Sequence, residues 1–155
     1  ALAAFGAKTT ATDYIHTLEN WGMYSTQMNI FFEKYDLYLT PTTASVAPKN
    51  GEVTTPVWQK PILKGLLKVG KAHYLAQGKL VEKMVQENLS WVPFTQLANV
   101  TGLPAMSVPL YWNKNGLPLG SQFIAPFGRE DRLLQLAAQL EQAQPWMPQY
   151  KNIQL

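Results

Sequence analysis

The chain has no cysteine, so its 155 residues offer no thiol nucleophile, no disulfide and no thiolate ligand for a metal. Arginine is scarce as well, since only Arg129 and Arg132 occur, and no basic residue alternates with aromatic ones as in a base-stacking groove. Long apolar runs are also missing, because no stretch approaches the roughly 18 residues that a membrane-spanning helix needs. These absences argue against a nucleic-acid partner and against a membrane-spanning helix.

Apolar side chains make up 46% of the sequence and aromatic ones 12%, whereas charged residues reach only 15%. This composition is typical of a globular domain whose aromatic surface is buried in a core, a pocket or a partner. The chain opens in Ala-Leu-Ala-Ala without an initiator methionine. We therefore expect residues 1–155 to form a single partial domain of a longer protein.

The first half of the chain predicts two helices and a strand. Apolar residues recur at helical spacing from Thr12 to Gly22 and again from Tyr24 to Asp36, with Gly22 expected to end the first helix. A short β-prone run over residues 37–40 follows and is stopped by Pro41. Residues 41–60 are rich in proline and threonine, which predicts a long loop of the kind that forms a lid or a binding wall.

Residues 61–90 predict a helical insertion between strands. Six of the thirteen basic residues lie between Lys60 and Lys83, with Glu82 as the single acid among them. This pattern favours a solvated helix face whose lysine stems cover apolar surface. An anionic membrane surface and an acidic partner are the alternative readings.

The last third predicts a hairpin between two helices. Pro93 opens a short helix that Gly102 ends, and strands over 105–111 and 118–125 flank an Asn-Gly turn. A helix that begins at Glu130 cannot pass Pro145. The order of elements indicates the α/β class, with a mixed sheet covered by helices.

No constellation of catalytic side chains is evident. None of the five serines lies in a Gly-x-Ser-x-Gly or Ser-x-x-Lys pattern, and Ser107 and Ser121 fit best as ordinary strand residues. His16 and His73 lack metal-ligand spacing, and no glycine-rich phosphate loop occurs. We therefore predict no catalytic residue, no cofactor and no metal site.

Three ordered blocks nevertheless resemble the amidase-signature family. They are Phe31–Thr42, which ends in Thr-Pro-Thr, then Phe94–Ala125, which holds Gly-Leu-Pro-Ala and Gly-Leu-Pro-Leu-Gly-Ser-Gln, and Phe127–Asp131. The last block and the ending Leu-Glu-Gln-Ala-Gln-Pro-Trp are similar to the branch that includes 6-aminohexanoate-cyclic-dimer hydrolase and related bacterial amidases. The resemblance implies the C-terminal part of the amidase-signature fold.

That resemblance further implies hydrolysis of linear or cyclic carboxamides by a Ser–cis-Ser–Lys triad located in a missing N-terminal portion of the same protein. The chain alone is then expected to be inactive. What it could supply is the edge of the sheet and a wall of the substrate channel. The candidate channel residues are Thr40, Pro41, Thr42, Phe94, Thr95 and Asn99.

One departure from the family bears on the substrate. Amidotransferase subunits of this family commonly carry an aspartate seven residues before the asparagine, where this chain has Val92. An apolar residue cannot pair with an ammonium group, so we expect a more apolar small amide as substrate, near Trp58, Trp91 and Phe94. We further expect a cytoplasmic protein, with a homodimer as one possible assembly. The alternative function is a non-catalytic binding or assembly module that reuses this fold segment.

Overall fold

A computed structural model describes residues 9–49, 61, 65, 86 and 89–150. The chain divides into two compact units, one formed by Ala1–Leu18 and Pro48–Ser90 and the other by Glu19–Ala47 and Trp91–Leu155. In the first unit the backbone is helical at Pro61, Gly65, Gln86 and Leu89. The expected loop from residue 50 onward, with Trp58, lies outside the described residues. So does most of the expected helical insertion, with nearly all of the Lys60–Lys83 segment.

Helix α2 runs from Ala11 to Phe32 without a break at Gly22. The expectation that Gly22 ends a first helix is therefore wrong. A single interior glycine costs a helix about 1 kcal/mol, which the flanking turns can offset. Leu18, Trp21, Met28 and Phe32 follow one another at helical spacing, so the two expected helices share one apolar stripe, and Met28 is its buried residue.

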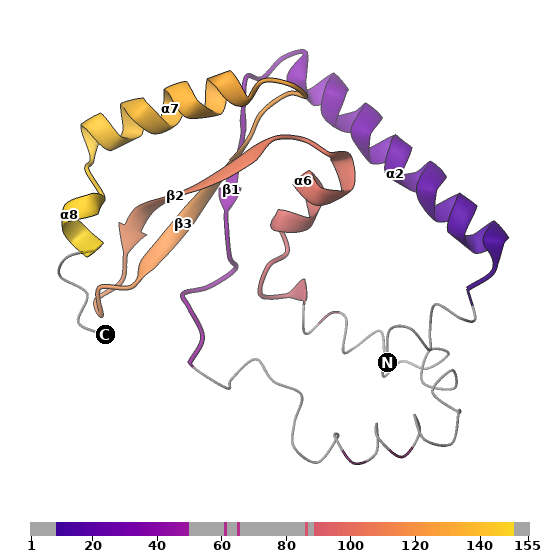
Figure 1. The fold of residues 1–155 in the computed structure, drawn as a ribbon, viewed down its shortest axis with the longest axis horizontal. Helices are drawn as coiled ribbons and strands as arrows, with labels where there is room; N and C mark the ends of the chain where they lie inside the picture. The colour runs from indigo at the N-terminus through magenta and orange to yellow at the C-terminus, as the bar shows by residue number, and fades with distance from the viewer. Residues whose placement is uncertain (1–8, 50–60, 62–64, 66–85, 87–88, 151–155) are drawn as a thin grey trace. The chain divides into compact units, whose positions relative to one another are not determined.

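Three strands form an antiparallel sheet in the order β1-β3-β2 (Figure 1). Strand β1 comprises Tyr38–Pro41, β2 Ala105–Trp112 and β3 Pro118–Ile124. The pairs Thr40↔Gln122 and Ser107↔Gln122 set the register on either side of the central strand. Pro41 is the last residue of β1, where a missing N–H costs the ladder least.

The hairpin between β2 and β3 forms as its Asn-Gly sequence predicts. Asn113 Oδ1 accepts hydrogen bonds from the backbone N–H groups of Asn115 and Leu117, each at 2.9 Å. Gly116 has a φ of 76°, a left-handed conformation that glycine adopts without a steric penalty. A register shift between Pro109 and Tyr111 leaves Leu110 as the extra residue of a β-bulge.

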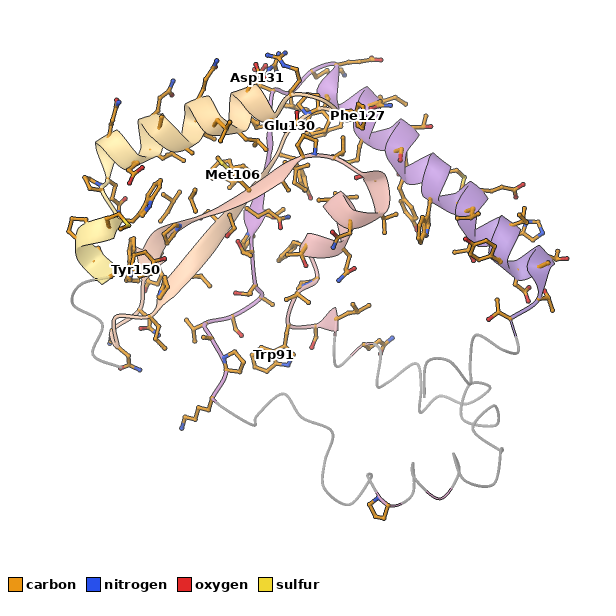
Figure 2. The ribbon with its side chains drawn as sticks, in the orientation of Figure 1. Trp91, Met106, Phe127, Glu130, Asp131 and Tyr150 are labelled. Atoms are coloured by element: carbon orange, nitrogen blue, oxygen red, sulfur yellow. The ribbon has the colours of Figure 1, made fainter. Side chains whose placement is uncertain are left out.

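One face of the sheet packs against α7, which runs from Glu130 to Ala143. Val108, Phe123 and Ala125 join Leu133 of α7 in a buried cluster, which Leu136, Leu140 and Trp146 extend. Figure 2 shows Glu130 and Asp131 together at the start of α7, where carboxylates favour the positive end of the helix dipole. A final turn, α8, covers Met147–Tyr150.

The opposite face packs against α6, which comprises Thr95–Thr101, and against the last turns of α2. Ile124 is fully buried there with Met28 and Leu103, and Leu97 of α6 packs on them. Gly102 ends α6 with a φ of 68°, as expected for a left-handed cap. Helices on both faces of the sheet confirm the α/β class and the covered sheet, and every pairing among the described strands is antiparallel.

Within the part of the chain that the structure describes, no helix is long and apolar enough to cross a membrane.

Candidate functional site

The α6 face of the sheet changes from apolar to polar along the strands. Side chains on this face alternate with those on the α7 face, because successive strand residues point to opposite sides. Tyr38 and Ile124 belong to the apolar end. At the other end, the same face carries a polar cluster, which we define as Thr40, Thr42, Ser107, Gly120 and Gln122.

Gln122 is the most deeply buried polar group of this cluster, with 4% of its surface exposed, and Thr40 beside it is 7% exposed. The Gln122 Nε2 group donates to the backbone carbonyl of Phe94 at 3.3 Å and lies 3.5 Å from Thr40 Oγ1. A buried carboxamide is stable only when its polar atoms find such partners. One side chain of the central strand therefore contacts both β1 and the residue that precedes α6.

The outer end of the polar cluster is a pair of hydroxyl groups above Gly120. Thr42 Oγ1 and Ser107 Oγ lie 2.5 Å apart and share a hydrogen bond, and both side chains are solvent-accessible. They meet because the central strand has no side chain between them. A Cβ atom on Gly120 would lie 2.6 Å from Thr42 Oγ1 and even closer to Ser107 Oγ. The backbone N–H of Thr42 also donates to the Gly120 carbonyl at 2.8 Å.

A second hydrogen bond joins the segment after β1 to the segment before α6. The Ala44 N–H donates to the Trp91 carbonyl at 3.0 Å. Trp91 lies at the start of the short segment that leads into α6 (Figure 2). Thr95 Oγ1 donates to the Val92 carbonyl at 3.2 Å, which closes the turn that opens the helix. The two stretches predicted to line a channel thus lie side by side, although they are far apart in sequence.

Only some of the six predicted channel residues contribute to the polar cluster. Thr40 and Thr42 belong to the polar cluster, and Phe94 joins it through its carbonyl. Pro41 points to the other face of the sheet by strand alternation, pairs with Ser121 and is exposed. Thr95 is half-buried at the first turn of α6, and Asn99 is exposed on that helix.

Ser107, Gly120 and Gln122 are the cluster members outside the six predicted residues, because all three fit the pattern of ordinary strand residues. A usable signal was present in the Gly-x-Gln spacing. Residues 120 and 122 lie on the same face of a strand, so a glycine beside a glutamine marks a place where neighbouring side chains can approach.

The cluster offers neutral hydrogen-bonding groups. Hydroxyl groups both donate and accept, and a carboxamide does the same, so these side chains can bind a neutral amide but do not ionise near neutral pH. Among the described residues, no group of acidic, histidine or cysteine side chains could hold a metal ion. The described arrangement is therefore suited to binding a neutral polar group rather than to acid–base chemistry.

Comparison with known proteins agrees with this fold. The model of the Amidase family matches residues 3–134, so the chain belongs to the amidase family, as its three sequence blocks predicted. Its relatives include a putative amidase, AmiC, of Mycobacterium leprae, which is 38% identical over 75% of this chain. A lipoamidase of Enterococcus faecalis is 33% identical over 91% of it, and a 6-aminohexanoate-cyclic-dimer hydrolase of a Pseudomonas strain is 37% identical over 76%.

A solved structure of 6-aminohexanoate cyclic dimer hydrolase bound to its substrate is also similar, with a TM-score of 0.66 and 31% identity. It matches 90% of this chain but only 26% of its own length. A bacterial aryl acylamidase shares the fold at a TM-score of 0.60 and 22% identity. The chain spans about a fifth of the length of the curated relatives it matches, at 20%, 19% and 21% of the three named above.

Proposed function

We propose that this chain is the C-terminal section of an amide hydrolase, in which it completes the sheet and forms one wall of the substrate channel. The remaining section of that protein would supply the Ser–cis-Ser–Lys triad, and this chain would contribute no catalytic residue. The proposal rests on membership of the amidase family and on the limited share of the relatives' length that the chain spans.

The observation that carries the channel wall is the contact between the two predicted segments. Gln122 lies between Thr40 and the Phe94 carbonyl, and Ala44 binds the Trp91 carbonyl. These contacts place neutral hydroxyl groups next to a turn with two large aromatic residues. A wall of this kind combines apolar surface with a few polar groups that orient a ligand, which is typical of small-molecule sites.

We propose a neutral, largely apolar amide as the substrate, either linear or cyclic. Val92 is half-buried in the turn before α6, where a carboxylate would be needed to bind an ammonium group. Trp91 and Phe94 are half-buried in the same turn and offer flat apolar surface for an acyl or amine group. The relatives that act on 6-aminohexanoate cyclic dimer support this substrate class.

We also place the protein in the cytoplasm, with no cofactor, no nucleic-acid partner and no membrane association. The principal partner of this chain is then the rest of the same protein, with a homodimer as one possible further assembly.

Release of amine or ammonia from a panel of linear and cyclic carboxamides tests the proposal. Both this chain and the natural-length protein that contains it are assayed at equal concentration. Activity in the natural-length protein alone is the expected result. Activity in neither would favour a binding or assembly module, and activity in this chain alone would show that it carries catalytic groups.

A further inference from the structure

Gln122 combines deep burial with contacts to two separate chain segments. The side chain is 4% exposed, so water cannot satisfy its carboxamide. Its Nε2 group lies within hydrogen-bond distance of the Phe94 carbonyl, at 3.3 Å, and at the long end of that range from Thr40 Oγ1, at 3.5 Å. These two acceptors use both N–H groups of the carboxamide.

The segment that Gln122 contacts has no regular secondary structure. Residues 91–94 form irregular turns before α6, and Phe94 occupies the N-cap position without a side-chain cap. Among the described residues, two long-range hydrogen bonds link this segment to the sheet and to the stretch after β1: Gln122 to the Phe94 carbonyl, and Ala44 to the Trp91 carbonyl. The first of these depends on a single side chain. Substitution can therefore remove it while the backbone bond stays.

The position of this segment decides where the aromatic side chains of Trp91 and Phe94 stand relative to Thr40 and Thr42. Irregular backbone without a tether samples several positions, and ordering it on ligand binding costs affinity. A buried side chain from the central strand fixes the segment before any ligand arrives. The strand itself is held on both sides, by β1 and by β2.

We propose that Gln122 is a positioning residue for amide binding: it holds the Trp91–Phe94 turn against the end of β1, so that both together present one preformed wall to the substrate. This inference rests on the proposed amidase function. Gln122 does not touch the substrate or the reacting atoms. It acts through Phe94 and Thr40, and it contributes to binding in the ground state and the transition state alike.

The test uses steady-state kinetics of the natural-length protein with its best amide substrate. Gln122→Met keeps the length and shape of the side chain but removes both donors. We expect KM to rise roughly three- to tenfold with kcat within about twofold, as for loss of uniform binding through a neutral hydrogen bond. The matched control is Gln139→Met on the exposed face of α7, which makes the same chemical change and should leave both constants unaltered.

A second pair of variants separates positioning from general destabilisation. Thr40→Val removes the weaker acceptor and should raise KM by a smaller factor, because the bond to the Phe94 carbonyl remains. Thr40→Ser restores the hydroxyl and should recover most of that loss. This pair also serves as the test if Gln122→Met does not fold.

Hydrogen exchange supplies a readout that kinetics cannot. In Gln122→Met, backbone amides around residues 92–97 should exchange faster, whereas those of α7 keep the exchange rate of the unmodified protein. Faster exchange in both places would mean loss of stability rather than loss of position, and would overturn the inference.

Unchanged KM in folded Gln122→Met, or a fall in kcat with KM unchanged, would also overturn it. If the unmodified protein hydrolyses no amide, the proposed function fails and this inference fails with it. An active protein with unaltered Gln122→Met kinetics rejects the inference alone.

Discussion

The two faces of the sheet differ in how they end. On the α7 face the apolar contacts run along β2, from Met106 through Val108 to Leu110, and α7 packs against them. On the α6 face the apolar contacts stop at Tyr38 and Ile124, and the polar cluster takes over. The same three strands thus carry apolar contacts on one side and, on the other, an apolar cluster that is followed by hydroxyl and carboxamide groups. The comparison predicts that substitutions on the two faces will have different consequences.

The largest effect on stability is expected from the α7 face. Leu133→Ala removes a side chain that is only 3% exposed and belongs to the buried cluster with Val108 and Phe123. Truncation of a buried leucine leaves a cavity and costs about 2–4 kcal/mol. Leu134→Ala is the matched control, because that neighbour is 70% exposed and should cost less than about 0.5 kcal/mol. Equal losses in urea unfolding would contradict the assignment of this face as the core.

Gly120→Ala is expected to disturb the α6 face next. The added Cβ would overlap the Thr42 and Ser107 hydroxyl groups, so one strand must shift at a cost of about 1–3 kcal/mol. Ser107→Ala removes one of the two obstacles. The double variant should therefore be less destabilised than the sum of the single ones, as measured by a double-mutant cycle. Strict additivity would mean that the hydroxyl pair does not meet above Gly120.

The sequence predicted most of the sheet and its helices because those signals are local. The Asn-Gly turn, Gly102 and the spacing of Leu133, Leu136 and Leu140 each specify a conformation within a few residues. The prediction that Gly22 ends a helix was wrong because it used only a local signal. A glycine weakens a helix locally, whereas the contacts of Met28 and the other apolar residues hold the helix together.

The candidate site was predictable only in part. Thr40, Thr42 and Phe94 were found through the order of family-like blocks, which places segments but not side chains. Ser107 and Gln122 join them through strand register, which depends on pairings between residues as distant as 65 and 82 positions in the sequence. Burial of a carboxamide among strand residues has no local signature, so sequence patterns alone could not find it.

A smaller effect on stability is expected in the Asn-Gly turn between β2 and β3, which lies outside both faces of the sheet. Asn113→Ala removes the carbonyl oxygen that accepts the Asn115 and Leu117 N–H groups and should cost about 1 kcal/mol. Asn115→Ala is the control on the same exposed turn, with an expected cost below about 0.5 kcal/mol. Thermal unfolding of the two variants distinguishes them, and a larger loss for Asn115→Ala would show that the Asn113 side chain does not stabilise the turn.

The smallest effect concerns pH at the start of α7. Arg129 binds Asp131 through two hydrogen bonds of 2.8 Å, and these bonds lower the pKa of Asp131 from 3.8 to about 2. A lowered pKa in the folded state adds stability above pH 4, and this contribution is lost as the pH falls from about 4 to about 2.

Arg129→Gln should return the pKa of Asp131 towards 3.8, as followed by NMR titration of its carboxyl group. Arg132→Gln is the control, because Arg132 acts on Asp131 more weakly than Arg129 and binds Asp36 instead. A full return of the pKa in Arg132→Gln would contradict the assigned cause.

The most direct measurement is a crystal structure of the natural-length protein with a bound, non-hydrolysed amide. We expect the ligand to contact the wall formed by the end of β1 and the turn before α6, with at least one contact to Thr42, Trp91 or Phe94. A ligand bound in the same protein with all its contacts elsewhere would contradict the claim that the α6 face of this sheet forms the substrate channel.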